Sequence, residues 1–125
     1  MTSPPDNLEQ LRARLAEFAR ARDWEQFHTP KNLAMALAGE AGELLEHFQW
    51  LTPEQSAALG PERRREVAHE LADILIYLIR LADRLGVDLL DATHEKIALN
   101  ESRYPAERVR GDARRASEYG RETDP

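Results

Sequence analysis

Apolar residues recur along most of the chain at the three- and four-residue spacing of an amphipathic helix. This pattern predicts a first helix over Asn7–Arg22, whose apolar face consists of Leu8, Leu11, Leu15, Phe18 and Ala19. Thr29 stands where an N-cap is expected, with Pro30 at the first helical position. We therefore expect a second helix from Pro30 to about Leu51.

Further start and stop signals divide the rest of the chain into helices. Prolines open a short helix over 53–60 and a long helix over 61–86, and each of these ends at a glycine. A last helix spans 88–104 and is terminated by Pro105. No run of residues alternates with period two, so we predict an all-α fold.

The domain organisation follows from the same pattern. Residues 1–105 are expected to form one folded domain, because the helical periodicity ends there. Residues 106–125 carry five arginines and five acidic residues with almost no large apolar side chains. A segment of this composition cannot bury enough apolar surface to fold, so we expect a disordered polar tail.

The long helix is apolar around about two thirds of its circumference, at 100° per residue. Its large apolar side chains are Val67, Leu71, Ile74, Leu75, Ile76, Tyr77, Leu78, Ile79 and Leu81. A helix of this kind is buried on several sides. Four short helices of one chain cannot surround it, so we expect a four-helix bundle that is completed by oligomerisation, as a dimer or a dimer of dimers.

Two pairs of carboxylates lie where apolar side chains are expected. Glu40 falls within the apolar arc of the second helix and Glu43 lies about 60° further round, so both can point at one object. Glu70 lies inside the apolar arc of the long helix, with Asp73 at its edge. Ordinary solvated carboxylates paired with lysine or arginine are the simpler interpretation of any single such residue.

Four carboxylates that converge at a core need a compensating charge, because an ionised carboxylate loses several kcal/mol when it leaves water unpaired. A divalent cation supplies that charge economically. A site with oxygen ligands alone, without histidine or cysteine, favours Mg²⁺ or Mn²⁺ over zinc or copper.

The last helix carries Lys96, Asn100 and Arg103 on one face. Two cations and an amide in a row suit a phosphate chain, because arginine binds phosphate oxygens in a bidentate way. The alternative is an exposed basic stripe that pairs with Glu95 or Glu101.

Aromatic residues are rare, yet several flank the second helix. Trp24, Phe27 and His28 precede this helix and Trp50 lies at its end. They could form a platform on which a nucleobase stacks. Alternatively, the rings fill the gap between the first two helices, and His28 is either a donor to a base edge or a structural cap.

Composition narrows the functional classes. The 125 residues contain 17 basic and 23 acidic side chains, for a net charge of −6, and no cysteine. The acidic balance argues against nucleic acid and anionic membranes as partners. Without cysteine there is no thiolate catalysis, disulfide or cysteine-bound zinc. With no apolar signal segment or membrane span either, the chain is expected to be cytoplasmic.

The segments GEAGE and HELAD resemble the metal signature of the all-α nucleoside triphosphate pyrophosphohydrolases, the MazG-like superfamily. That signature has the form EExxE, a spacer and ExxD. Glu40, Glu43, Glu70 and Asp73 match it, whereas Gly39 stands at the first glutamate. The segments DWEQFH, FQW and K-x₃-N-x₂-RYP are similar to the dCTP pyrophosphatase branch, and the likeness extends over residues 7–111.

This resemblance implies Mg²⁺-dependent hydrolysis of a nucleoside triphosphate, with Mn²⁺ as a substitute, in an oligomer of helical dimers. The substrate implied is dCTP or a 5-modified dCTP, which gives dCMP and diphosphate in nucleotide-pool sanitation. Among the four expected metal ligands Glu40, Glu43, Glu70 and Asp73, either Glu43 or Glu40 would orient the attacking water. The base and sugar would contact Trp24, Phe27, His28, Trp50 and Tyr77. Phosphates and sugar would contact Lys31, Lys96, Asn100, Arg103 and Tyr104.

Two other functions remain open at this point. A pyrophosphatase for another nucleotide, such as dUTP, differs by as little as one pocket contact. A helical nucleotide-binding or oligomerisation module without turnover is the second alternative. Such a module has no need of carboxylate pairs at core edges, where leucine is more stabilising.

Overall fold

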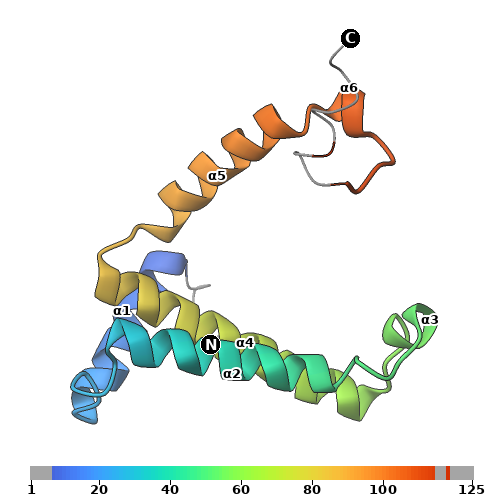
Figure 1. Ribbon diagram of the computed structural model, residues 1–125. Helices are drawn as coiled ribbons and strands as arrows, with labels where there is room; N and C mark the ends of the chain where they lie inside the picture. Colours follow the sequence, from blue (N-terminus) through green and yellow to red (C-terminus); the bar gives the residue numbers. More distant parts are fainter. Residues whose placement is uncertain (1–6, 115–117, 119–125) are drawn as a thin grey trace, which may run out of the picture. The chain divides into compact units, whose positions relative to one another are not determined.

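The computed structural model describes residues 7–114 and 118. All regular elements in these residues are helices, so the all-α prediction is confirmed (Figure 1). The six helices are α1 (Leu8–Ala21), α2 (Pro30–Glu46), α3 (Pro53–Ser56), α4 (Pro61–Leu85), α5 (Leu89–Arg103) and α6 (Ala106–Val109).

Local capping explains where the helices begin and end. Asn7 and Gln10 form a reciprocal capping box at the start of α1. The hydroxyl of Thr29 accepts a hydrogen bond from the Asn32 amide at 3.1 Å, as expected for the N-cap of α2. α4 ends at Gly86, whose φ of 69° is the left-handed conformation that glycine adopts without strain.

Two helices end several residues earlier than the sequence predicts. α2 ends at Glu46 rather than near Leu51, and residues 47–50 form turns. In these turns the amides of His47 and Phe48 bond to carbonyls only three residues earlier. A tertiary contact fixes this end, because Arg63 donates to the His47 carbonyl at 3.2 Å. The short helix expected over 53–60 stops at Ser56.

The segment expected to be a disordered tail begins differently. Residues 106–109 form one helical turn, α6, directly after Pro105. Residues 110–114 follow without regular structure. Residues 115–117 and 119–125, which are also expected to belong to the disordered tail, lie outside the described residues.

The chain divides into two compact units, with the boundary between Val87 and Asp88. In the first unit α2 and α4 lie side by side and run in opposite directions, and α1 packs against α4 (Figure 1). The buried apolar side chains of the described chain come from these three helices: Ala19, Leu33, Val67, Ile79 and Ala82.

A charged triad joins α1 to α4. The carboxylate of Asp83 accepts from Arg12 of α1 at 3.1 Å and from Arg80 of α4 at 3.2 Å. Arg80 is only 3 % exposed, so Asp83 is its counterion in the interior.

One face of α4 remains largely exposed within the chain. Leu71, Leu75, Leu78 and Leu85 are 53 %, 42 %, 37 % and 56 % exposed, respectively. Their spacing of four, three and seven residues puts them on one side of the helix. The apolar surplus predicted for this helix is therefore present, and its burial by another chain stays a prediction.

The second unit contains α5 and α6. Asp88 caps α5 by accepting from the Asp91 amide at 3.0 Å, as the sequence predicted. Lys96, Asn100 and Arg103 are exposed along α5. Among the described residues, no helix combines the length and the apolar composition that a membrane crossing requires.

Candidate functional site

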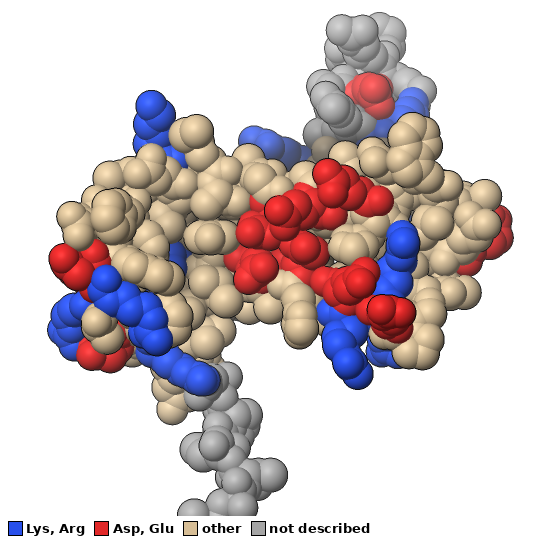
Figure 2. Space-filling model, turned by 90° about the horizontal axis from the view of Figure 1, so that it is seen from below, with Lys and Arg blue, Asp and Glu red and all other residues tan. Residues whose placement is uncertain are grey.

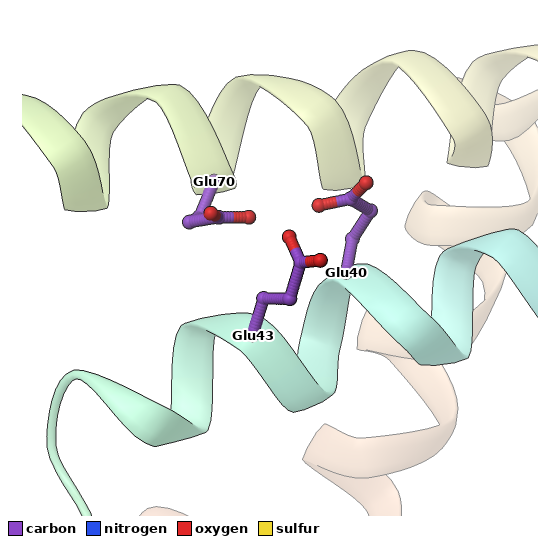
Figure 3. A group of neighbouring side chains, drawn as sticks. All are labelled: Glu40, Glu43 and Glu70. Carbon is purple, nitrogen blue, oxygen red and sulfur yellow. The ribbon is translucent and has the colours of Figure 1, made fainter.

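Three carboxylates converge between α2 and α4. Figure 3 shows Glu40 and Glu43 pointing from α2 toward α4, and Glu70 pointing back toward them. One oxygen from each side chain lies within 4.8 Å of one oxygen of each of the others. The i, i+3 spacing on α2 places both of its glutamates on the face that packs against α4.

These carboxylates are electrostatically unsatisfied as a group. Glu40 and Glu70 each have a buried Oε2 that finds no hydrogen-bond partner among the described atoms. The contact with Glu70, followed by burial and the neighbouring Glu43, raises the pKa of Glu40 to about 7. Like charges held this close favour either a shared proton or a bound cation.

The donor set fits a hard divalent cation. It consists of carboxylate oxygens alone, which Mg²⁺, Mn²⁺ and Ca²⁺ prefer, and a cation would pair the two buried oxygens of Glu40 and Glu70. Figure 2 shows that acidic side chains gather in one patch on the face that it draws, with basic side chains on either side of the patch. The geometry therefore supports a metal site at Glu40, Glu43 and Glu70.

Asp73, the fourth predicted ligand, lies beside this cluster rather than within it. It is exposed, one helical turn after Glu70, and its negative charge also raises the pKa of Glu40. Asp73 also lines a cavity between α1, α4 and the loop that joins α1 to α2. It thus connects the carboxylate cluster to that cavity.

A cavity of about 240 Å³ lies between α1, α4 and the loop that joins α1 to α2. Its lining is mostly apolar with a few polar groups, which is typical of small-molecule sites. The lining residues are Leu15, Phe18, Ala19, Trp24, His28, Asp73, Ile76, Tyr77 and Arg80.

The loop over residues 22–29 is folded so that the rings of Trp24 and His28 reach the cavity. Asp23 adopts a φ of 54°, a left-handed conformation that aspartate tolerates in turns. The Trp24 amide then bonds to the Ala19 carbonyl at 2.9 Å. The Trp24 ring meets Phe18 edge to face, with centroids 5.7 Å apart, and lies 6.2 Å from the His28 ring.

Two arginines of α4 hold His28 in place. Arg80 donates from Nε to the Nδ1 of His28 at 3.3 Å, and Arg84 donates from Nε to the His28 carbonyl at 3.1 Å. Burial, followed by the positive charges of Arg80 and Arg84, lowers the pKa of His28. Because Nδ1 accepts a hydrogen bond, the neutral ring carries its proton on Nε2.

The structure brings together some of the residues predicted to contact base and sugar. Trp24, His28 and Tyr77 line the cavity, whereas Phe27 and Trp50 do not. Phe27 is 59 % exposed and Trp50 is 86 % exposed. Trp50 follows the C-terminal end of α2, and a 17-residue helix is about 25 Å long, so within one chain it cannot reach the aromatic loop at the other end.

The residues predicted to hold phosphates lie on two elements. Lys31 is exposed in the first turn of α2. Lys96, Asn100 and Arg103 lie on α5, and Tyr104 is the C-cap of that helix. α5 belongs to the second unit of the chain, so their role toward the carboxylates stays a prediction of the sequence.

Sequence reasoning missed five of the nine side chains that line the cavity, namely Leu15, Phe18, Ala19, Ile76 and Arg80. Phe18 was assigned only to the apolar face of the first helix, and Arg80 was not singled out. The signal for Arg80 was present, because it is a charged residue within the run ILIYLIRLA, seven residues after Asp73 and three after Tyr77. The same reasoning that identified Glu70 inside an apolar arc applies to it.

Comparisons with known proteins identify the family of the chain. The model of the MazG-like family matches residues 36–118. Human dCTP pyrophosphatase 1 is 48 % identical over 118 residues, which cover 93 % of this chain and 69 % of the human protein. The bovine dCTP pyrophosphatase 1 is 50 % identical over 113 residues, covering 89 % of this chain and 67 % of the bovine protein.

A solved structure shares both fold and sequence with the chain. The crystal structure of a pyrophosphatase from Archaeoglobus fulgidus superposes with a TM-score of 0.75 and is 38 % identical, covering 84 % of this chain and 98 % of that one. The family model spans α4, α5 and most of α2, and so includes all four carboxylates of the signature. The chain therefore belongs to the MazG-like family.

Proposed function

We propose that this chain is a nucleotide pyrophosphohydrolase of the dCTP diphosphatase type, which converts dCTP and water to dCMP and diphosphate. Four relatives named dCTP pyrophosphatase 1 are 46–50 % identical to it and match most of its length. The structural observation that carries the proposal is the convergence of Glu40, Glu43 and Glu70 beside a cavity with an aromatic wall.

Mg²⁺ is the cation that we propose for the carboxylate cluster, with Mn²⁺ as a substitute. Glu40, Glu43 and Glu70 would hold it, with Asp73 completing the set. When bound, the ion supplies positive charge against the phosphate oxygens and the departing diphosphate. In this way an acidic protein binds a polyanionic substrate.

The side chains of the chain then have distinct roles. Glu43 is the exposed member of the cluster, so it can accept a hydrogen bond from a solvent water and orient that water toward the α-phosphorus. Glu40 is the alternative group for this role. Attack at phosphorus by an oriented water breaks the bond to the diphosphate, and most of the rate comes from positioning and electrostatics.

The cavity would hold the nucleoside. Asp73 and Tyr77 lie one turn apart on α4, so a substrate whose phosphates meet the carboxylates extends its sugar past Tyr77. The base then lies at the end formed by Trp24, where an aromatic ring offers a stacking face. Lys31 of α2 stays a proposed phosphate contact, as do Lys96, Asn100, Arg103 and Tyr104 of the second unit.

Besides the nucleotide, we propose a second copy of the chain as a binding partner. The exposed leucines Leu71, Leu75, Leu78 and Leu85 form an apolar face on one side of α4. Contiguous apolar surface of this kind marks an interface in soluble proteins. A second copy presents the same face, which is how twofold dimers bury such a helix.

We propose the cytoplasm as the compartment in which the protein acts.

Product analysis tests the proposed function. Purified protein is incubated with dCTP and Mg²⁺, and the products are separated by ion-exchange chromatography. The expected products are dCMP and diphosphate in equal amounts, with no turnover in EDTA. Release of dCDP and single phosphates, or activity that EDTA leaves unchanged, would contradict the proposal.

A further inference from the structure

Arg80 is the buried charged residue of the described chain. It is 3 % exposed, on α4, within a stretch that is otherwise apolar. Arginine is almost never fully buried unless its charge and its N–H groups are paired. The partners of its three nitrogens therefore indicate whether the residue is only structural.

Two of the three guanidinium nitrogens have partners and the third does not. Nε donates to the Nδ1 of His28 at 3.3 Å, and Nη1 donates to Asp83 at 3.2 Å. Nη2 is buried without a hydrogen-bond partner among the described atoms. A buried donor left unpaired is costly, so an occupant of the adjacent space that brings an acceptor is favoured.

Arg80 is one of the residues that line the cavity proposed for the nucleoside. Arg80 lines it together with Trp24, His28, Tyr77 and Asp73. Arg80 lies seven residues beyond Asp73, about 10 Å further along the helix axis and away from the carboxylate cluster. A substrate whose phosphates lie at that cluster therefore brings its base, rather than its phosphates, to Arg80.

His28 strengthens the donor character of this end of the cavity. Its Nδ1 is used as the acceptor for Arg80, so its remaining ring nitrogen, Nε2, carries a proton. The polar side chains at this end are thus hydrogen-bond donors. A base that presents acceptors fits such a wall, whereas a base that presents a donor there leaves two donors facing each other.

We infer that Arg80 is a specificity-determining residue, whose Nη2 donates to the acceptor edge of a cytosine base formed by N3 and O2. This inference rests on the proposed function. Cytosine presents two adjacent acceptors at N3 and O2, whereas uracil and thymine carry a hydrogen on N3. Arg80 therefore favours dCTP over dUTP and TTP.

The alternative is that Arg80 only holds His28 and Asp83, and matched variants separate the two roles. Arg80→Met removes every donor at similar length, and Arg80→Lys keeps the charge beside Asp83 without the second nitrogen of the fork. Arg84→Met is the control, because Arg84 also holds His28, through its carbonyl, but does not line the cavity. Circular dichroism melting identifies variants that stay folded.

The first measurement compares kcat/KM for dCTP with that for dUTP. We expect the wild-type ratio to exceed ~10, and to fall at least ~10-fold in Arg80→Met and Arg80→Lys, because one lost polar contact changes discrimination by that order. Arg84→Met should lower both values in parallel and keep the ratio. An unchanged ratio in a folded Arg80 variant, or no preference in the wild type, would overturn the inference.

The second measurement needs neither metal nor turnover. Binding of dCMP and dUMP in EDTA is followed by quenching of tryptophan fluorescence, since Trp24 lines the cavity. The wild type should bind dCMP more tightly, and Arg80→Lys should bind both alike. If the wild type hydrolyses no triphosphate, the proposed function fails, whereas an equal preference in wild type and Arg80→Lys shows that only the role of Arg80 is wrong.

Discussion

Glu40 of α2 and Glu70 of α4 face each other across the helix pair, and each has a buried carboxylate oxygen without a hydrogen-bond partner among the described atoms. Their contact is the largest of the causes that raise the pKa of Glu40 to about 7. Two packed helices gain no stability from such a pair on their own account. The arrangement is therefore best explained by what binds there, and it leads to direct tests.

Replacement of Glu70 by glutamine should weaken stabilisation by Mg²⁺ while leaving the helices intact. The variant removes one cation ligand and relieves the repulsion with Glu40, so the metal-free protein should melt no lower than the wild type. Mg²⁺ affinity should fall at least ~10-fold. The measurement is the shift of the melting temperature on titration with Mg²⁺. The control is Glu46→Gln, because Glu46 is exposed on α2, the helix that also carries Glu40 and Glu43. This variant should keep the full shift of the melting temperature.

The raised pKa of Glu40 makes metal binding depend on pH. Glu40 must lose its proton to bind a cation, so Mg²⁺ should stabilise the protein more at pH 8 than at pH 6. Without metal the protein should instead be less stable at pH 8 than at pH 6. The reason is that the pKa of Glu40 is raised above its value in the unfolded chain, and the stability that this gives is lost as pH rises through about 7. Melting curves at both pH values, with Mg²⁺ or EDTA, measure this. Stabilisation by Mg²⁺ that is independent of pH would show that Glu40 is not a ligand.

The link between α1 and α4 predicts a stability effect remote from the metal site. Asp83→Asn takes away the counterion of Arg80, which is 3 % exposed, and should lower the free energy of unfolding by about 2 kcal/mol. Arg12→Gln removes the more exposed partner of the same carboxylate and should cost less than about 1 kcal/mol. Urea denaturation of both variants gives the comparison. Equal losses would mean that the burial of Arg80 does not matter.

The leucine face of α4 predicts an oligomer that a single charge disrupts. Leu75 is 42 % exposed in the centre of that face, and Leu75→Glu would place a carboxylate inside the proposed interface. Light scattering after gel filtration should give a multiple of 14.3 kDa for the wild type and a shift toward 14.3 kDa for the variant. By helical spacing, His69 lies on the side of α4 opposite to the leucine face. The control variant His69→Glu should therefore leave the mass unchanged. A wild-type mass of one chain at micromolar concentration would refute self-association through this face.

Local signals in the sequence predicted the helices well, because caps and glycine stops act over a few residues. Asn7–Arg22 and Pro61–Gly86 agree with α1 and α4 to within one residue at each end. The end of α2 was wrong by five residues, because the last turns are set by the contact between Arg63 and the His47 carbonyl. Contacts between distant residues leave no periodic trace in the chain.

The candidate site, like the fold, was predictable from the sequence only in part. The carboxylates were found because a charge within an apolar helical arc is visible in the sequence, and Glu40, Glu43 and Glu70 do meet. The position of Trp50 could not be judged in the same way, since its distance from Trp24 depends on the length and direction of α2. The partners of Arg80 depend on how the loop before α2 folds back onto α4.

The carboxylate cluster should make this chain a metal-dependent pyrophosphohydrolase. The most direct measurement is the rate of diphosphate release from dCTP with Mg²⁺ by the wild type, Glu70→Gln and Glu46→Gln, each with its helicity checked by circular dichroism. We predict turnover in the wild type and Glu46→Gln, and a loss of at least ~100-fold in Glu70→Gln at unchanged helicity. Diphosphate release by Glu70→Gln at a rate near that of the wild type would contradict the account.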